Sequence, residues 1–472
     1  MNIKGFLLAG AIVTLLGGCT LAPEYTRPGA PVPADWPTGA AYQETMSAVS
    51  ATAAAAAAVV SWREFFTDER LQKVIGIALS NNRDLRLAAL NVERARALYG
   101  IQRAELLPTV NAVGSGSRQR VPADLSSTGS AMTAEQYSVN LGITSWEIDF
   151  FGRIRSLKDR ALEEYLATDQ ARRSAQILLV SATAQAYTVL AADRENLKTA
   201  TATLEAQEST YKLIRKQYDL GIVSELDLRR SQSQVDAASV EAARWTQVAA
   251  QDENALNLLA GSPLPPALLP ADLGGVTPPT EVSAGLSSEI LLQRPDVLAT
   301  EHRLKAANAN IGAARAAFFP RISLTTAIGT ASADLSGLFK SGSGTWMFAP
   351  QIAVPIFDAR TWSAYDVTKA DREIAVAQYE KAIQTAFREV ADALAVRGTV
   401  EMQIAAQQSL VDAVAETYRL SQVRYTLGLD SYLAVLDAQR SLYAAQQGLI
   451  ALHLVRLANL VTLYTVLGGG SQ

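Results

Sequence analysis

The sequence predicts an α+β membrane protein built from two copies of one plan, in which pairs of short strands interrupt long helices. Three observations support this prediction. The chain opens with an apolar export signal, most of its length is duplicated, and segments of helical periodicity alternate with segments of strand periodicity. Alternation of apolar and polar residues over about ten positions is typical of strands that face lipid on one side and water on the other.

Residues 1–18 have the layout of a secretory signal peptide. Lys4 precedes a continuous apolar run, and small residues come directly before Cys19. The letters LGGC that end at Cys19 resemble the lipobox of bacterial lipoproteins, in which the cysteine is lipidated and becomes the mature N-terminus. Thr20 follows instead of an aspartate, which by the same resemblance favours sorting to the outer membrane. The alternative is an ordinary signal peptide with a cysteine nearby.

Composition excludes several classes of function. The 472 residues carry a net charge of −4, which argues against binding to nucleic acid. Two histidines and one cysteine are very few for an enzyme or metalloprotein of this length, and once Cys19 is lipidated no thiol remains for a disulfide. His302 and His453 each stand alone in a helical pattern and indicate packing or surface positions. With no phosphate loop, metal-binding pair or nucleophile elbow in the sequence, we expect no catalytic residue, no metal site and no cofactor other than the lipid on Cys19.

Two long segments of the chain share one pattern. Arg83–Pro108 matches Pro295–Pro320 at an offset of 212, and the letters Tyr-x-Leu-Gly recur 207 positions apart. Such self-similarity indicates an internal repeat. We expect the chain to divide into five segments: the signal peptide at 1–18, the lipidated N-terminal segment at 19–66, the first repeat at 67–261, the Pro- and Gly-rich linker at 262–287 and the second repeat at 288–472. The Ala-rich tract at 51–58 is read as an insert in the N-terminal segment.

Each repeat contains two candidate strands that flank a Gly- and Ser-rich loop. They are expected at about 109–120 and 136–147 in the first repeat, and at about 321–331 and 345–357 in the second. Tyr137, Val139 and Leu141 alternate with polar residues, which places one apolar and one polar face on this strand. No run of ~18 apolar residues follows the signal, so any passage through a membrane would need a closed β-barrel. A membrane barrel needs about eight strands or more. The four strands of one chain are too few, so several chains must contribute; the alternative is a soluble β-ribbon.

The helical segments are unusually long. Helices are expected at 67–107 and 288–319, each stopped by a proline, and at about 152–217 and 359–424, where no proline occurs. At ~1.5 Å per residue, the longer pair would each extend on the order of 100 Å, deeper than a compact domain. Apolar and tyrosine residues seven positions apart along these helices favour a coiled coil.

Four motifs now identify a resemblance. They are PEYTRP after Cys19, WEIDFFGRIR at Trp146–Arg155, QRPDVLATEHRLKAANANIGAARAAFFPRISLT, and RYTLGLDSYLAVLDAQRSLYAAQQ. With them the chain resembles the outer-membrane channel-tunnels of the TolC family, and within that family the lipid-anchored multidrug-efflux branch that is OprM-like. The resemblance covers nearly all of the mature chain.

The resemblance implies a homotrimer in the outer membrane of a Gram-negative bacterium. Three chains would give four strands each to a 12-stranded β-barrel, which continues as a long α-helical coiled-coil tunnel in the periplasm, girdled by the linker and terminal segments. The implied role is a passive exit duct for drugs and other small toxic compounds. It would dock through a periplasmic adaptor (membrane fusion) protein onto an inner-membrane RND-type transporter. Alternatives within the class are metal-ion efflux and type I protein secretion; outside it, they are a membrane-tethered enzyme and a coiled-coil spacer.

The two Tyr-x-Leu-Gly turns are the candidate periplasmic tips. Gly221 and Gly428 end long helices, and glycine adopts at low cost the left-handed geometry that closes a helix. By resemblance, the triplets Leu220-Gly221-Ile222 and Leu427-Gly428-Leu429 would contact the adaptor. The alternative is that both glycines only form the turns.

Resemblance also assigns the aperture of the tunnel. Asp437, nine residues after Gly428, would point into the periplasmic constriction, where three carboxylates would repel one another and attract cations. Asp227 and Tyr425 would form a closing contact between hairpins. Asp430 stands where the prototype secretion channel has a basic residue, which excludes a salt bridge from Asp227 to that position. Ala434 replaces a second acidic ring, so the cation block should be weaker.

Overall fold

The computed structural model describes residues 20–42, 61–280 and 287–469. The expected signal peptide, Cys19 and the Ala-rich tract at 51–58 lie outside the described residues. The chain forms two compact units that are interleaved in sequence. Unit 1 comprises the described residues up to Gly29 together with Asn91–Thr168 and Ala299–Tyr379, and unit 2 comprises the rest. Each unit therefore contains parts of both repeats.

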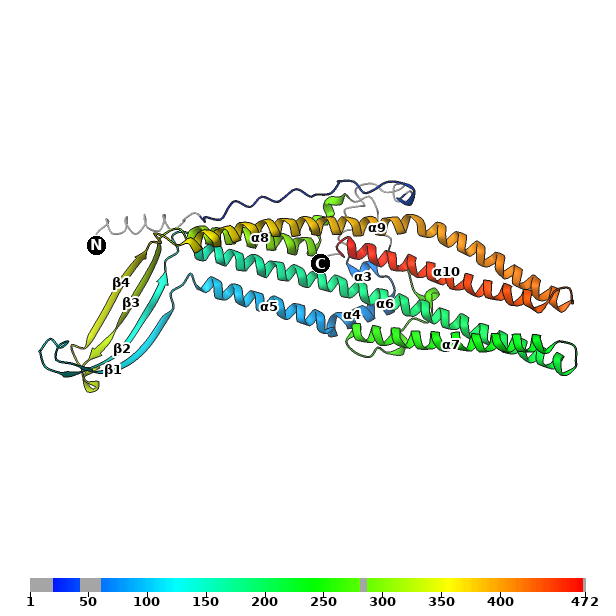
Figure 1. Cartoon of the computed structure of the whole chain (residues 1–472), viewed down its shortest axis with the longest axis horizontal. Coiled ribbons are helices and arrows are strands. Elements are labelled where there is room, and N and C mark those ends of the chain that lie inside the picture. The colour runs from blue at the N-terminus through cyan, green and yellow to red at the C-terminus, as the bar shows by residue number, and fades with distance from the viewer. Residues whose placement is uncertain (1–19, 43–60, 281–286, 470–472) are drawn as a thin grey trace. The chain divides into compact units, whose positions relative to one another are not determined.

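The described residues of unit 1 contain a four-stranded antiparallel sheet with strand order β1-β2-β3-β4 (Figure 1). The strands are β1 (Val110–Val121), β2 (Met132–Glu147), β3 (Arg321–Ser332) and β4 (Gly344–Ala353). All four strands lie where the alternating pattern predicts them, but β2 begins earlier than expected because Met132 still pairs with Val121. β4 ends earlier than expected, shortly before Pro355, whose ring nitrogen has no hydrogen to donate to a ladder.

The sheet has one apolar and one polar face, as the alternation predicts. Leu141 lies opposite Ile328, which in turn lies opposite Trp346. These side chains share a face because residues paired across antiparallel strands point to the same side. On the other face, the hydroxyls of Ser115 and Ser138 are 2.8 Å apart. Trp346 is 78% exposed and Ile328 is 67% exposed, so the apolar face is uncovered within the single chain.

The WEIDFFGRIR motif returns the chain from β2 to the following helix. Glu147 accepts hydrogen bonds from Arg153 at 2.8 and 2.9 Å, and Asp149 accepts from the backbone amide of Arg155 at 2.8 Å. Gly152 has a φ of 74°, a left-handed conformation that glycine adopts without strain. The acidic and basic residues of this motif therefore pair with each other to fix a tight return.

Six helices carry the rest of the repeats: α5 (Arg83–Ala104), α6 (Arg153–Asp219), α7 (Glu225–Ala260), α8 (Pro295–Ala316), α9 (Ala359–Thr426) and α10 (Tyr432–Val466). Two shorter helices, α3 (Trp62–Phe65) and α4 (Glu69–Asn81), precede them. Further 3₁₀ turns lie at η2 (Pro266–Leu268), η3 (Leu273–Gly275), η4 (Ser288–Gln293) and η5 (Leu335–Gly337). The expected long helices are confirmed, since α6 has 67 residues and α9 has 68 without a break.

The single helix expected at 67–107 is wrong, because the chain forms α4 and α5 instead. Asn82 stands between them with an extended backbone, φ −62° and ψ 131°. Its side-chain oxygen accepts a hydrogen bond from the backbone amide of Leu85 at 3.0 Å. An asparagine that caps a helix in this way satisfies an amide that the next turn leaves free, so a new helix starts where the apolar pattern alone predicts continuity.

The main core lies in unit 2. Aromatic side chains of α3 and α10 stack there, with 4.7 Å between the ring centroids of Phe65 and Tyr464. Within the described residues, α6 and α10 each hold an 18-residue stretch apolar enough on average to cross a membrane by length and composition, although polar residues interrupt both stretches. Tyr187 of α6 and Leu457 of α10 belong to the core, so packing accounts for part of the apolar character of both helices.

In unit 1 the N-terminal segment is fastened to α8 through Glu301. This carboxylate accepts hydrogen bonds from Tyr25 at 3.1 Å and from Arg27 at 3.0 and 2.7 Å, and it pairs with Lys305 at 3.2 Å. Its side chain is only 3% exposed. Burial alone would raise the pKa of Glu301, but the bonds and charges of Arg27 and Lys305 outweigh it, so the pKa lies below its ordinary value.

We expect Glu301→Gln to lower the stability of the protein by about 1–3 kcal/mol at neutral pH, because Arg27 and Lys305 lose their buried counter-charge. A carboxyl whose pKa is depressed on folding stabilises the protein above its unfolded pKa, and that stabilisation is lost as the pH falls through the folded pKa. The difference between wild type and variant should therefore shrink as the pH falls below the ordinary value of 4.5. Thermal unfolding of both proteins across pH measures this, with the exposed Glu416→Gln as control. Equal stability at neutral pH would contradict the assignment.

Candidate functional site

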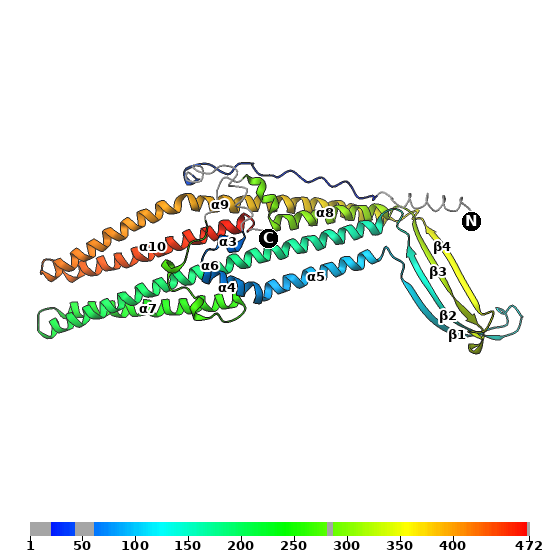
Figure 2. The same ribbon diagram turned by 180° about the vertical axis from the view of Figure 1, so that it is seen from behind.

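The two candidate tips have the same backbone geometry. They join α6 to α7 and α9 to α10, and both lie at one end of unit 2 (Figure 2). Gly221 and Gly428 have φ values of 73° and 71°. The amide of Ile222 bonds the carbonyl of Gln217 at 2.8 Å, and that of Leu429 bonds Arg424 at 2.9 Å. This pattern is a Schellman motif, so the expected left-handed glycine turn is confirmed at both places.

The apolar residues beside these glycines point into solvent. Leu220 and Ile222 are 74% and 67% exposed at the first tip, and Leu427 and Leu429 are 67% and 62% exposed at the second. A cluster of large exposed apolar side chains is typical of a surface that another protein covers. The tips therefore have the character of docking surfaces.

An ion pair distinguishes the second tip from the first. Arg424, near the end of α9, donates to both carboxylate oxygens of Asp430 at 2.5 and 3.1 Å. The bonds from Arg424 hold the pKa of Asp430 below its ordinary value. The corresponding residues of the first tip, at the offset of 207, are Gln217 and Val223, which are unable to form such a pair. The carboxylate of Asp430 is thus already paired within its own turn.

A small apolar cluster packs the two hairpins of one chain against each other just behind the tips. It contains Ile214, Leu228, Tyr432, Val435 and Leu436, with Tyr211, Val223, Tyr418 and Tyr425 against it. The rings of Tyr425 and Tyr432 lie 5.3 Å apart. Burial, with smaller contributions from Tyr425 and Tyr418, raises the pKa of Tyr432 to about 12.

The structure brings Asp227 and Tyr425 near each other without a hydrogen bond between them in the described part of the chain. Burial first, and then the charge of Asp227, raises the pKa of Tyr425. The carboxylate of Asp227 accepts instead from the Ser224 hydroxyl at 2.7 Å, while Ser224 caps α7 by accepting from the amide of Asp227 at 3.2 Å. In the single chain, Asp227 therefore serves the start of its own helix.

Asp437 lies on the exposed side of α10 and forms an ion pair with Arg440, one turn further along. Its neighbours in sequence, Leu436 and Ala438, are buried. The sequence interpretation missed both Arg440 and Arg424. Arg440 follows Asp437 by three residues, a spacing that puts opposite charges on one helical face, so this pair was open to prediction.

The arrangement offers apolar surfaces suited to docking at the tips and to lipid contact at the sheet. Among the described residues, no three His, Cys, Asp or Glu side chains are grouped so that they could hold a metal ion. The apolar and polar faces of the sheet fit contact with lipid on one side and with water on the other. A four-stranded sheet of this kind is too small to close alone and fits one part of a β-barrel that several chains form together.

Comparison with known proteins identifies the family. The model of the outer membrane efflux protein family matches residues 74–262 and 286–469. The same model thus matches twice, over ranges close to the two repeats expected from the sequence. Matches over this much of the sequence show that the chain belongs to the outer membrane efflux protein family.

Relatives match over nearly their whole length. The toluene efflux pump outer membrane protein TtgC of Pseudomonas putida is 50% identical over 469 residues, covering 99% of this chain and 96% of that protein. The outer membrane protein OprJ of Pseudomonas aeruginosa is 42% identical over 479 residues, covering 100% and 97%. The solved open state of the MtrE outer membrane channel of Neisseria gonorrhoeae has a TM-score of 0.85 and 39% identity, covering 96% of this chain and 99% of that one.

The fold class expected from the sequence is therefore confirmed. Three chains form a 12-stranded outer-membrane β-barrel that continues as an α-helical periplasmic tunnel. The protein is not an enzyme. It is the outer-membrane exit duct of a tripartite efflux system, and it works as a homotrimer with a periplasmic adaptor and an inner-membrane RND-type transporter.

Proposed function

We propose that this duct carries drugs, solvents and other small toxic compounds out of the cell. The relatives are named for the efflux of toluene, solvents and antibiotics, and the identity with them extends over nearly the whole chain. Metal-ion efflux and type I protein secretion remain the alternatives. Neither is favoured by a specific residue in the described part of the chain.

The exposed apolar tips are the observation that carries the docking part of the proposal. Four large apolar side chains are exposed to solvent beside two left-handed glycines. We expect both tips to contact the adaptor through these residues: Leu220, Gly221, Ile222, Leu427, Gly428 and Leu429. Burying them against an apolar partner would remove that surface from water, which is favourable in proportion to the area covered.

Deletion and complementation test the cargo and the docking together. Deleting the gene should sensitise the cell to dyes, drugs and solvents, and the wild-type gene should restore resistance. Leu427→Asp should restore much less resistance, because a charged tip would have to lose its water to meet an apolar partner; Leu410→Asp, at an exposed position farther along α9, serves as the matched control. Trimer levels in the outer membrane are measured in parallel. Selective sensitivity to copper or silver salts would overturn the multidrug assignment, and full resistance with Leu427→Asp would overturn the docking assignment.

We further propose that Asp437 lines the periplasmic constriction, with Asp227 and Tyr425 forming a closing contact there. Three Asp437 side chains around the axis of a trimer would attract cations. The partner Arg440 reduces that attraction, because each carboxylate already faces a guanidinium of its own helix.

Asp437→Ala should weaken the block of the trimer by a trivalent cation in planar bilayers, since the attracting carboxylates are removed. Arg440→Ala should strengthen the block, because it leaves those carboxylates uncompensated. Asp412→Ala, at an exposed position on α9, serves as the control. An unchanged block in both variants would remove Asp437 from the constriction.

Cys19 is proposed to carry a lipid anchor after removal of residues 1–18. Support comes from its neighbour Thr20, whose hydroxyl lies 3.3 Å from that of Ser156 in the first turn of α6. This places the residue next to Cys19 close to the turn that leaves the sheet, and so close to the membrane in the channel. Palmitate labelling of cells should mark the wild type and leave Cys19→Ser unlabelled. Label on the variant, or none on the wild type, would refute the anchor.

A further inference from the structure

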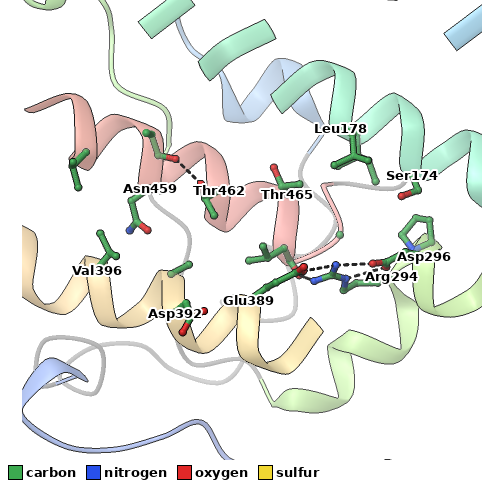
Figure 3. A pocket seen from close by; sticks show the side chains of 17 residues that line it. Ser174, Leu178, Arg294, Asp296, Glu389, Asp392, Val396, Asn459, Thr462 and Thr465 are labelled. Atoms are coloured by element: carbon green, nitrogen blue, oxygen red, sulfur yellow. Dashed lines mark hydrogen bonds and ion pairs between the residues drawn. The ribbon is translucent and has the colours of Figure 1, made fainter. Parts of the chain in front are cut away.

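Unit 2 contains a large cavity at the level where α10 ends and α8 begins. It lies between α6, α9, α10 and the start of α8 and has a volume of about 790 Å³ (Figure 3). Cavities that hold small organic molecules have volumes of about 300–1,000 Å³. Its walls are mainly apolar, and three of their side chains remain well exposed: Leu178 at 56%, Val455 at 42% and Val396 at 36%.

The charged groups in the cavity are predominantly acidic. Arg294 is bound by Asp296 at 3.0 and 2.7 Å, by Glu389 at 2.9 Å and by the carbonyl of Val466 at 2.8 Å. Burial would lower the pKa of Arg294, but its two carboxylate partners outweigh burial and raise it. Asp392 also lines the cavity, and no ion pair involving it is found within the described residues. The cavity wall thus carries three carboxylates and one guanidinium, and two of the carboxylates already pair with that guanidinium.

The cavity opens on the side of α9 that is opposite to the N-terminal segment. Trp36 stacks on Phe387 with 4.9 Å between the ring centroids, and Ala41 lies against Gly398, where a Cβ would come within 2.2 Å of its carbonyl oxygen. Glu389 and Val396, which line the cavity, are each two residues from these contacts, a rotation of about 200° around a helix. The resemblance to the channel-tunnels implies that the N-terminal segment lies on the outside of the tunnel, so the cavity would belong to the side that faces the lumen.

We propose that this cavity is a binding site for amphiphilic organic cations on their way through the duct. Its apolar walls suit a flat or bulky apolar body, and the surplus of carboxylates suits a positive charge. The inference rests on the proposed function, because it assumes that such compounds travel through the lumen. It adds a place in the tunnel where cargo of this class is retained.

Binding is tested with the intact trimer in detergent. Ethidium is the cationic probe and N-phenyl-1-naphthylamine the neutral one, both followed by fluorescence. Asp392→Asn should weaken ethidium binding about two- to fivefold, as expected for one partly exposed charge, and should leave the neutral probe unaffected. Asp412→Asn on the same helix, outside the cavity, is the matched control. Val455→Trp should weaken binding of both probes by filling the cavity, and Leu178→Trp is a second filling variant should the first misfold.

A labelling experiment asks whether a second copy of the chain covers the cavity instead. Cys19 is the only cysteine in the sequence, so Val455→Cys adds one thiol to test with a maleimide, and the buried Leu457→Cys is the unreactive control. The proposal predicts rapid labelling of Val455→Cys in the trimer and protection of that thiol by ethidium. It is overturned by a thiol that is inaccessible in the trimer, by wild type that binds no ethidium, or by an Asp392→Asn variant that binds ethidium like wild type. If wild type restores drug resistance in cells yet binds no ethidium, only this inference fails; if it restores none, the proposed function fails.

Discussion

The whole structure depends on a sheet that is unable to close by itself. Four antiparallel strands leave β1 and β4 as edges, each with a row of unpaired backbone groups, and one face of the sheet is apolar. Unpaired backbone groups cost several kcal/mol each in lipid. Both problems are solved together when three chains join edge to edge, since closure pairs every edge and turns the apolar face toward lipid. The trimer is thus a condition for the membrane fold, and the coiled helices that follow inherit its symmetry.

The duplication supplies similar hairpins, but the two copies have diverged where the N-terminal segment binds. That segment contacts α8 at Glu301, at Asn308 and at Gly312, where a Cβ would lie 2.7 Å from the backbone nitrogen of Ala22. The equivalent residues of the first copy, at the offset of 212, are Ala89, Arg96 and Gly100. Gly100 has open space around it, but the carboxylate that holds Arg27 is missing. The residues that bind the N-terminal segment in the second copy, Glu301 and Asn308, are replaced in the first copy by Ala89 and Arg96. These differences favour binding of the segment to the second copy.

Features that depend on local sequence could be predicted well. The lengths of α6 and α9 follow from the absence of proline, the strand faces follow from strict alternation, and Gly221 and Gly428 follow from turn chemistry. Features that depend on a choice between partners could not. Asn82 is a favourable cap, but the helical period of the flanking residues continues across it. The folded chain adds a contact that the local sequence does not show, because the Asn82 side-chain amide donates to the carbonyl of Leu259 at 3.0 Å, 177 residues away in the sequence. The partner of Asp430 likewise depends on the folded turn, which brings Arg424 back over it.

Charge at the tips is largely neutralised within each chain, and this shapes how the aperture can work. Asp430 pairs with Arg424, Asp227 with Arg230 and Asp437 with Arg440. Such pairs between exposed groups contribute little to stability and are screened by salt. The contact that holds the two hairpins of a chain together is instead the cluster around Tyr432 and Leu436, which is apolar and unaffected by screening. Separating those hairpins exposes apolar surface, and a partner that covers such surface offsets that cost. The exposed leucines and isoleucine at the tips are surfaces that such a partner can cover. Opening would then replace apolar contacts between the hairpins by apolar contacts with the partner. The charged residues would mainly select which ions pass.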